Sequence, residues 1–322
     1  MDAAAAARRL AAGDLVAFPT ETVYGLGADA ANESAVAKIF SLKGRPADHP
    51  VIVHVADIRG LAEWSAGAPR AALALAEAFW PGPLTLVVPR SPRVPSIVTG
   101  GQASVGIRCP SHPVARELLR EFARVGSGAI AAPSANRFGH VSPTTADHVR
   151  DEFGGAVPVL EGGACEVGLE STIVDLSRGR AVLLRPGGIS RAQIAAVLGE
   201  APRERDAEAP RASGTLAAHY APVTALSLVS AEELAAGLGV LTNAAVLALG
   251  EAPVNARAVS WIVAGSDPGR YGHDLYANLR RLDASGAKRI LVEAPPSAPE
   301  WEAVNDRLAR AAAGSIAGDD EP

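Results

Sequence analysis

The sequence predicts an α/β protein in two domains, the first built on a large, twisted, mixed sheet with flanking helices. Along the first 198 residues, short apolar runs alternate with alanine-rich or amphipathic stretches, which is typical of strands separated by helices. A charged, proline-containing segment then interrupts the alternation, and a shorter α/β pattern follows. With 322 residues, 48% of them hydrophobic, the chain is long and apolar enough for two cores.

The elements of the first domain, residues 1–198, are predicted from apolar runs and their boundary residues. Asn32 can cap a helix that Gly44 would end, Pro69 and Pro113 open two further helices, and Ser190 has capping-box spacing. So many strands between helices favour a mixed sheet with helices packed on it. The strands are expected at residues 15–18, 50–55, 84–88, 105–109, 129–132, 157–160, 172–176 and 181–184.

The second half of the chain predicts a linker and a smaller domain. Residues 199–222 begin with a charged, proline-containing stretch that has no apolar period, so we expect a linker there. From residue 223 the βα pattern resumes, with Ser230 and Glu233 in capping-box spacing. Strands near Val246 and Trp261, helices at 271–284 and 301–313, and a strand at 289–293 predict a Rossmann-like α/β domain over 223–322.

Composition and charge exclude several classes of protein. Cys109 and Cys165 match no CxxC spacing, which argues against a zinc site or a disulfide framework. No signal peptide and no apolar span of about 20 residues is recognised, so we expect a cytoplasmic protein with no membrane partner. Residues 1–195 hold 19 Lys+Arg and 18 Asp+Glu, or +1, and the remainder hold 11 and 17, or −6. This balance gives no support for tight nucleic-acid binding.

The most informative segment is FPTETVYGLG, residues 18–27. An apolar run is stopped by a proline, and two threonines, Glu21 and Tyr24 follow before two glycines. Polar groups crowded at the end of a buried strand are typical of a small-molecule site in an α/β protein. A turn whose side chains cap its own backbone explains this segment, taken alone, equally well.

Cationic side chains form two further candidates. Lys43 and Arg45 surround the glycine that ends the Asn32 helix, and they can hold phosphate oxygens as a point charge and a bidentate fork. Lys43 could instead interact with its own helix's terminal carbonyls, but this leaves Arg45 unexplained. Arg108 ends an apolar strand, where it must be paired with either an internal carboxylate or a ligand carboxylate.

Polar groups also follow later strands. Ser134 and Asn136 come after residues 129–132, where they form either an Asx-type turn or a hydroxyl and amide pair for a nucleotide. Gly-Gly pairs at 162–163 and 187–188 flank the GLEST segment, residues 168–172. The repetition of hydroxyls, amides and cations at five strand ends predicts one convergent polar site. No P-loop motif is present, no GxGxxG opens a helix, and no GxSxG elbow for a serine hydrolase is found. The histidines are scattered without metal-ligand spacing, so a protein-held catalytic metal is not expected.

Together these motifs resemble the YrdC-like threonylcarbamoyl-AMP synthases in their long, two-domain form. The matches cover residues 8–198 in the family's order, and His219-Tyr-Ala-Pro resembles the start of the second domain of the long form. The matching motifs are FPTETVYGLG, KGRP, WPGPLT, GIR, APSAN, GLEST and LRPG. The resemblance implies a YrdC-like α/β fold and a nucleotidyltransferase that makes threonylcarbamoyl-AMP and pyrophosphate from ATP, L-threonine and bicarbonate.

The resemblance also implies roles for individual residues. Lys43 and Arg45 would bind the phosphates, and Arg108 the threonine carboxylate, so these three are the predicted catalytic residues. The predicted threonine contacts are Thr22, His54, Arg108, Ala132 and Ser171. The predicted ATP contacts are Lys43, Arg45, His49, Ser104, Ser134, Asn136, Ser142, Arg185 and Tyr220. Mg²⁺, held mainly by the ATP phosphates, is the implied cofactor.

The same resemblance implies partners and leaves alternatives open. The product would pass to downstream proteins that transfer threonylcarbamoyl to tRNA, and a weak direct contact with tRNA stays open. Other readings are an RNA-binding module, and a carbamoyl-adenylate chemistry with a different amine acceptor. The sequence departs from the family pattern at His49, where asparagine is common, and at Ser213-Gly214, where proline-glycine is usual. It also has Pro299-Glu-Trp-Glu where a glycine-rich turn is common, so no function is assigned to that segment.

Overall fold

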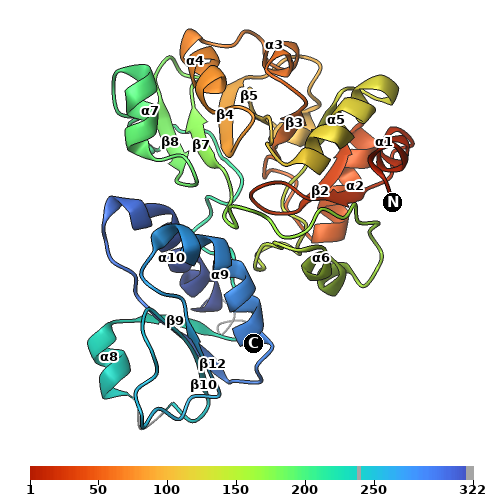
Figure 1. The fold of residues 1–322 in the computed structure, drawn as a ribbon. Helices are drawn as coiled ribbons and strands as arrows, with labels where there is room; N and C mark the ends of the chain where they lie inside the picture. The colour runs from red at the N-terminus through yellow and green to blue at the C-terminus, as the bar shows by residue number, and fades with distance from the viewer. Residues whose placement is uncertain (238–240, 317–322) are drawn as a thin grey trace. The chain divides into compact units, whose positions relative to one another are not determined.

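A computed structural model describes residues 1–237 and 241–316, which form two compact units (Figure 1). The first unit comprises Met1–Phe138, Pro143–Glu166 and Glu170–Thr215. The second comprises Gly139–Ser142, Val167–Leu169 and the chain from Leu216 onward. Residues 199–215, which the sequence assigns to the linker, therefore belong to the first unit.

The first unit is built on an eight-stranded mixed sheet, as the sequence predicts. Its strands are β1 (Val16–Phe18), β2 (Gly25–Asp29), β3 (Val53–Val55), β4 (Leu84–Pro89), β5 (Ser104–Arg108), β6 (Ala129–Ala131), β7 (Thr172–Asp175) and β8 (Val182–Arg185). Their order is β1-β2-β6-β3-β5-β4-β7-β8. The β3–β5 and β4–β7 pairs are parallel and the other pairs are antiparallel.

Helices cover both faces of this sheet, but unequally. They are α1 (Ala3–Ala11), α2 (Glu33–Lys43), α3 (Arg59–Trp64), α4 (Arg70–Phe79), η1 (Ser96–Thr99), α5 (Pro113–Val125), α6 (Ala146–Phe153) and α7 (Arg191–Leu198). One large core joins the sheet to α2, α3, α4, α6 and α7. On the other face, α1 and α5 cover the β1–β6 side, and Ala209 and Ala212 pack on Val87, Ile173 and Leu184.

Local signals in the sequence explain where these helices begin and end. The Asn32 side chain accepts a bond from the backbone amide of Ala35, and Gly44 ends α2 with φ of 65°, a conformation that glycine adopts at little cost. Pro113 occupies the first turn of α5. The capping box at Ser190 and Gln193 is formed as predicted.

Two strand predictions need correction. Residues 157–160 form no strand, because their ladder is limited to an isolated bridge between Ala17 and Val159. Conversely, residues 25–29, which include both glycines of the 18–27 motif and where no strand is predicted, form strand β2. A Cβ on Gly27 would lie 2.9 Å from both Ile130 and the Phe18 ring. The glycine is therefore required by close packing between strands rather than by a turn.

The second unit has a smaller parallel sheet in the order β11-β10-β12-β9. Its elements are β9 (Leu226–Val229), α8 (Ala231–Ala236), β10 (Ala244–Ala248), β11 (Ser260–Val263), α9 (Pro268–Asp283), β12 (Arg289–Glu293), η3 (Pro299–Trp301) and α10 (Glu302–Ile316). The capping box of Ser230 and Glu233 opens α8 as predicted. Helix α9 packs against β10 and α10 against β9. This parallel α/β arrangement agrees with the Rossmann-like prediction.

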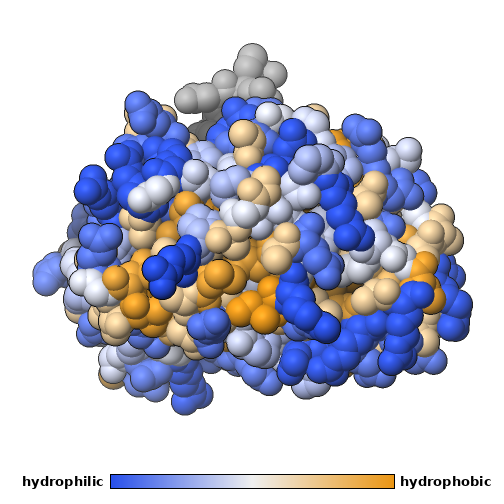
Figure 2. All heavy atoms as spheres, turned by 90° about the horizontal axis from the view of Figure 1, so that it is seen from above, coloured by the Kyte–Doolittle hydropathy of each residue, from blue (hydrophilic) through white to orange (hydrophobic). Residues whose placement is uncertain are grey.

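The surface carries some exposed apolar residues. Figure 2 shows apolar side chains gathered within a hydrophilic surround on one face, and Leu73 of α4 is 39% exposed. Single exposed apolar residues are ordinary on folded proteins. Within residues 1–237 and 241–316, no helix combines the length and the apolar character that a membrane span requires.

Candidate active site

Several predicted site residues lie on one face of the large sheet. Alternate residues of a strand point to opposite faces, so Ser104, Gly106 and Arg108 of β5 share a face. Val105 and Ile107, between them, pack into the helix-covered core. Ser104 and Arg108 stand at the two ends of β5, roughly 13 Å apart along the strand. The site is thus a strip of sheet face with a polar side chain at each end.

Arg108, at one end of the strip, is buried and ion-paired. Its Nη2 lies 2.8 Å from Oε1 of Glu21, and its Nε donates to the carbonyl of Gly82 at 3.4 Å. Because only 3% of Arg108 is exposed, its charge requires such a partner. Of the two partners that the sequence left open, the internal carboxylate is therefore present. A ligand carboxylate on the same guanidinium stays a prediction.

His54 lies beside Arg108 on the neighbouring parallel strand. The two residues are in register between β3 and β5, and the His54 ring packs edge-on against Phe18 with centroids 5.9 Å apart. Burial, and secondly the charge of Arg108, lower the pKa of His54 to about 3. The imidazole is therefore neutral at neutral pH, so it can take part in hydrogen bonds without adding charge to the strip.

The other residues predicted to contact threonine are buried and come from three separate segments. The Thr22 hydroxyl lies 2.9 Å from that of Thr20, in the turn before β2. Ala132 follows β6 and donates its backbone amide to the residue that precedes β3. The Ser171 hydroxyl, just before β7, lies 2.7 Å from that of Thr85 in β4. Hydrogen bonds thus tie the Ala132 and Ser171 segments to the sheet, whereas the Thr22 bond lies within its own turn.

Lys43 is fully buried and is anchored away from its own helix. Its Nζ donates to the carbonyl of Ser134 at 2.7 Å and to that of Asn136. Burial, and secondly the charge of Arg45, hold the pKa of Lys43 well below its usual range. Interaction with the terminal carbonyls of α2 is therefore not what the structure shows. Lys43 instead joins two predicted ATP contacts, Ser134 and Asn136, into one cluster.

Arg45 and His49 pack around one aromatic ring. Arg45 donates to the carbonyl of Pro50 at 2.8 Å and, from Nε, to that of His49 at 3.4 Å. Its guanidinium lies 5.7 Å from the Phe138 ring centroid, and the His49 ring lies 5.4 Å from the same ring. Burial, and secondly Arg45, lower the pKa of His49. The two predicted ATP contacts are therefore neighbours.

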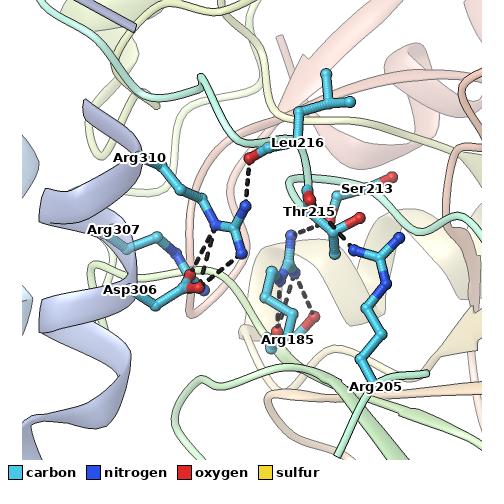
Figure 3. Close-up of polar contacts among 9 residues, drawn as sticks. Arg185, Arg205, Ser213, Thr215, Leu216, Asp306, Arg307 and Arg310 are labelled. Atoms are coloured by element: carbon cyan, nitrogen blue, oxygen red, sulfur yellow. Dashed lines mark hydrogen bonds and ion pairs between the residues drawn. The ribbon is translucent and has the colours of Figure 1, made fainter. Parts of the chain in front are cut away.

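Arg185 ties the end of β8 to the Ser171 turn and to segment 199–215. It donates to the carbonyl of Ser171 at 2.9 Å and to that of Ser213 at 2.8 Å (Figure 3). The Ser213 hydroxyl in turn donates to the carbonyl of Pro50 at 2.8 Å. Thr85, Ser104 and Gly106 of the sheet and Arg211 to Ser213 of the segment line one narrow cavity. Segment 199–215 therefore lies over the Ser104 end of the strip.

Ser142 and Tyr220, two of the predicted ATP contacts, belong to the second unit. An isolated bridge between His140 and Ala221 places their segments side by side. The Tyr220 backbone has φ of 64°. The centroids of the Tyr220 and Tyr276 rings lie 5.7 Å apart. Tyr220 is 1% exposed, so in this structure its ring is part of the interior of the second unit.

Sequence reasoning left three residues of the site without a role. Glu21 pairs with Arg108, as described above. The Tyr24 hydroxyl donates to the carbonyl of Gly163 at 2.8 Å and accepts the amide of Gly162, and burial raises its pKa to about 12. Thr85 orients Ser171. All three stood inside recognised motifs, Glu21 and Tyr24 in FPTETVYGLG and Thr85 at the end of WPGPLT, but no role was assigned to any of them.

The fold and the strip together define a class of protein. Cations, hydroxyls and a neutral imidazole share one face of a mixed sheet, and within the described ranges no three His, Cys, Asp or Glu side chains gather as a metal site. This arrangement is typical of an α/β enzyme that binds polar, anionic small molecules.

Comparison with known proteins identifies the family. The sequence model of a family described as "Telomere recombination" matches residues 8–187, and that of "Threonylcarbamoyl-AMP synthase, C-terminal domain" matches residues 189–313. The threonylcarbamoyl-AMP synthase of Pyrococcus abyssi is 40% identical over 314 residues, covering 93% of this chain and 90% of the relative. That of Bacillus subtilis is 39% identical over 336 residues, covering 97% and 93%.

A solved structure agrees with these sequence matches. The crystal structure of Pyrococcus abyssi Sua5 complexed with L-threonine matches with a TM-score of 0.87 and 36% identity, covering 97% of this chain and 94% of that chain. The chain therefore belongs to the threonylcarbamoyl-AMP synthase family, in its two-domain form. The family and the fold class predicted from the sequence are confirmed.

Proposed function

We propose that this chain is a nucleotidyltransferase that converts ATP, L-threonine and bicarbonate into threonylcarbamoyl-AMP and pyrophosphate. The observation that carries the proposal is the strip of sheet face, which has Arg108 and His54 at one end and Ser104 at the other. The relatives' name and the threonine complex of one of them support this assignment.

The Arg108 end would hold threonine. Its guanidinium would bind the carboxylate as a planar fork, with the neutral His54 and the Thr22 and Ser171 hydroxyls around the amine and side chain. The Ala132 backbone would close the pocket on the side of β6. Because all five residues are buried, bound threonine would be shielded from water there, which strengthens each polar contact.

The nucleotide would occupy the rest of the strip. Lys43 and Arg45 would bind the phosphates, and Arg185 would add a further cation. The remaining proposed ATP contacts in the first unit are His49, Ser104, Ser134 and Asn136. Ser142 and Tyr220, which belong to the second unit, stay predictions as ATP contacts. An ammonium has three donors, and the described contacts of Lys43 use two of them, so one remains available for a phosphate oxygen.

The proposed chemistry needs positioning and charge stabilisation rather than a covalent nucleophile. The threonine nitrogen bonds to the carbon of bicarbonate to give a carbamate, with loss of water. A carbamate oxygen then attacks the α-phosphorus of ATP, and the bond to the bridging oxygen of pyrophosphate breaks. Lys43 and Arg45 would stabilise the charge that collects on the leaving pyrophosphate.

Magnesium fits this site only as part of the nucleotide. Because the described residues offer no carboxylate and histidine cluster, the ion would be held by ATP phosphates and water. When bound, Mg²⁺ would neutralise part of the phosphate charge, while Lys43 and Arg45 supply the protein's own positive charge. We propose this arrangement rather than a protein-held metal centre.

The proposed product also implies a cellular setting. Threonylcarbamoyl-AMP is an activated acyl donor, so a downstream protein must transfer its threonylcarbamoyl group to tRNA. We place the synthesis of threonylcarbamoyl-AMP in the cytoplasm and in the first domain, residues 1–198. We assign no catalytic step to residues 223–322.

Pyrophosphate release tests the proposal directly. Purified protein with ATP, L-threonine, bicarbonate and Mg²⁺ should release pyrophosphate and accumulate threonylcarbamoyl-AMP, which chromatography with mass detection identifies. Omitting threonine or bicarbonate should stop both signals. Release that does not depend on threonine would contradict the proposal. A panel of other amino acids tests the alternative of a different amine acceptor.

A further inference from the structure

Glu21 is a buried carboxylate inside the recognised motif, and the proposed chemistry does not use it. It lies in the turn between β1 and β2 and is 1% exposed. Thr20 fixes this turn, because its hydroxyl donates to the carbonyl of Val23 at 2.6 Å and accepts the amides of Thr22 and Val23, each at 3.2 Å. The backbone that carries Glu21 is therefore held in place before any ligand binds.

Both oxygens of Glu21 have a defined partner. Oε1 lies 2.8 Å from Nη2 of Arg108, and Oε2 accepts the backbone amide of Ser111 at 3.0 Å. Ser111 stands three residues after Arg108, so Glu21 holds the side chain and the following backbone of the same segment. The Nη2 contact with Glu21 and the Nε bond to the Gly82 carbonyl together hold the guanidinium at two of its atoms.

Electrostatics leave Glu21 as the charge partner of Arg108. His54 is in register with Arg108, but burial keeps it neutral, with its pKa lowered to about 3. Burial raises the pKa of the Cys109 thiol to about 11 and that of the Cys165 thiol to about 12, so both stay protonated. Among the described groups that interact with Arg108, Glu21 is thus the one that supplies negative charge.

We propose that Glu21 is a positioning residue that aims Arg108 at the carboxylate of the amino-acid substrate. The described contacts of Arg108 use Nη2 for Glu21 and Nε for Gly82, which directs the Nη1 side of the planar fork towards the ligand. Glu21 also compensates the buried charge while the site is empty. This inference rests on the proposed role of Arg108 in threonine binding.

Calorimetric titration of the full-length protein with L-threonine and, separately, with ATP tests the inference. Glu21→Gln keeps an acceptor for Ser111 but removes the charge, and we expect threonine affinity to fall roughly 10-fold or more, because the buried guanidinium of Arg108 loses its ionic partner. ATP affinity should change less than about twofold, since Glu21 lies at the amino-acid end. Glu21→Asp keeps the charge but is one methylene too short to reach both partners, so it should also weaken threonine binding.

Two controls separate positioning from general destabilisation. Asp175→Asn removes another buried carboxylate, 0% exposed and 2.9 Å from Arg178, so it should lower stability without changing threonine affinity. In an Arg108→Gln background, Glu21→Gln should have no further effect on threonine binding, because Glu21 acts through Arg108. Thermal melting of each variant establishes that the folded protein is measured.

The outcomes distinguish this inference from the proposed function. Unchanged threonine affinity in Glu21→Gln and Glu21→Asp, or an equal loss of threonine and ATP affinity, would overturn the role of Glu21 alone. An equal loss in Asp175→Asn would overturn it as well. A wild-type protein that binds no threonine and releases no pyrophosphate would defeat the proposed function, and the inference with it.

Discussion

The two units of this protein differ sharply in what they bury. In the described part of the second unit, the buried charged side chain is Arg307. Its guanidinium carbon lies 5.4 Å from the centroid of the Tyr220 ring, and its Nη1 lies 2.5 Å from Oδ2 of Asp306. The first unit buries many more. They are Glu21, Lys43, Arg45, Arg108, Glu170, Asp175 and Arg185.

Under the proposed function, this difference reflects substrate binding in the first unit. Burying a charge costs stability unless it is paired, and apolar replacements of a buried pair are often neutral or stabilising. The first unit carries this cost at Lys43, Arg45, Arg108 and Arg185, the four cations proposed to bind substrates. In the second unit, Arg307 pairs with Asp306 and lies over the Tyr220 ring, and no substrate role is proposed for it.

The largest expected effect is at Arg108. Arg108→Ala should raise the KM for threonine roughly 100-fold, because truncating one member of a buried charge pair costs about 2–5 kcal/mol in binding. The KM for ATP should change less than about threefold, since contacts at distant sites act independently. Steady-state pyrophosphate release at varied threonine and ATP measures both constants.

An exposed ion pair supplies the control for Arg108. Arg59→Ala removes an arginine that pairs with Asp57 at 2.6 Å but is 83% exposed, and such pairs contribute little. Both KM values should therefore stay at the wild-type level in this variant. Equal shifts in the two KM values for Arg108→Ala would show that the role assigned to Arg108 is wrong.

Lys43 should have the next largest effect, on the other substrate. Lys43→Ala removes a proposed phosphate contact and two bonds to the 134–136 turn, so the KM for ATP should rise roughly 10- to 100-fold, as expected for hydrogen bonds to a charged group. The KM for threonine should change less. Lys38→Ala, an exposed lysine on the same helix, is the matched control. An unchanged ATP dependence would contradict the phosphate assignment.

These predictions could be framed from sequence because the signals were local. The caps at Asn32 and Ser190 and the apolar runs of β4, β5 and β7 depend on neighbouring residues, so they predicted those elements directly. The family motifs supplied the site residues. Strand β2 was not predicted, because its glycines follow from contacts with Phe18 and Ile130 that only the folded chain brings close.

Long-range pairing explains what else the sequence could not supply. Glu21 and Arg108 are far apart in the chain, and the sequence could state that Arg108 needs a partner without naming it. The bonds from Lys43 to Ser134 and Asn136 likewise join two segments that are far apart in the chain, and the local pattern of neither segment predicts the contact. The position of segment 199–215 on the sheet depends on Arg185 and Ser213 meeting, which charge and proline content do not predict.

A smaller effect, on stability, concerns His54 and pH. The folded-state pKa of His54 is lowered to about 3, so the unfolded chain binds a proton below its pKa of about 6.5 while the folded chain does not. Stability from this group is present above pH 6.5 and is lost as the pH falls towards 3, by about 2 kcal/mol at pH 5. Urea unfolding at pH 7.5 and 5.0 measures the loss.

Substitution isolates the contribution of His54. His54→Gln should reduce the difference in unfolding free energy between pH 7.5 and 5.0 by about 2 kcal/mol, because it removes the titrating group. An identical pH dependence in wild type and His54→Gln would show that the imidazole is not buried as described.

The smallest expected effect comes from two buried tyrosines, one in each unit. Tyr271 is 1% exposed and packs edge-on against Trp301 at 5.4 Å, yet its hydroxyl has no partner among the described residues. Tyr271→Phe should therefore leave the unfolding free energy unchanged or raise it by up to about 1 kcal/mol, because it removes an unsatisfied buried polar group. Tyr24→Phe should instead lose about 1–2 kcal/mol, because it breaks the bonds to Gly162 and Gly163. Urea unfolding of both variants measures the contrast. If Tyr271→Phe lost as much stability as Tyr24→Phe, the buried hydroxyl in the second unit would stabilise the fold as much as the hydrogen-bonded hydroxyl in the first unit does.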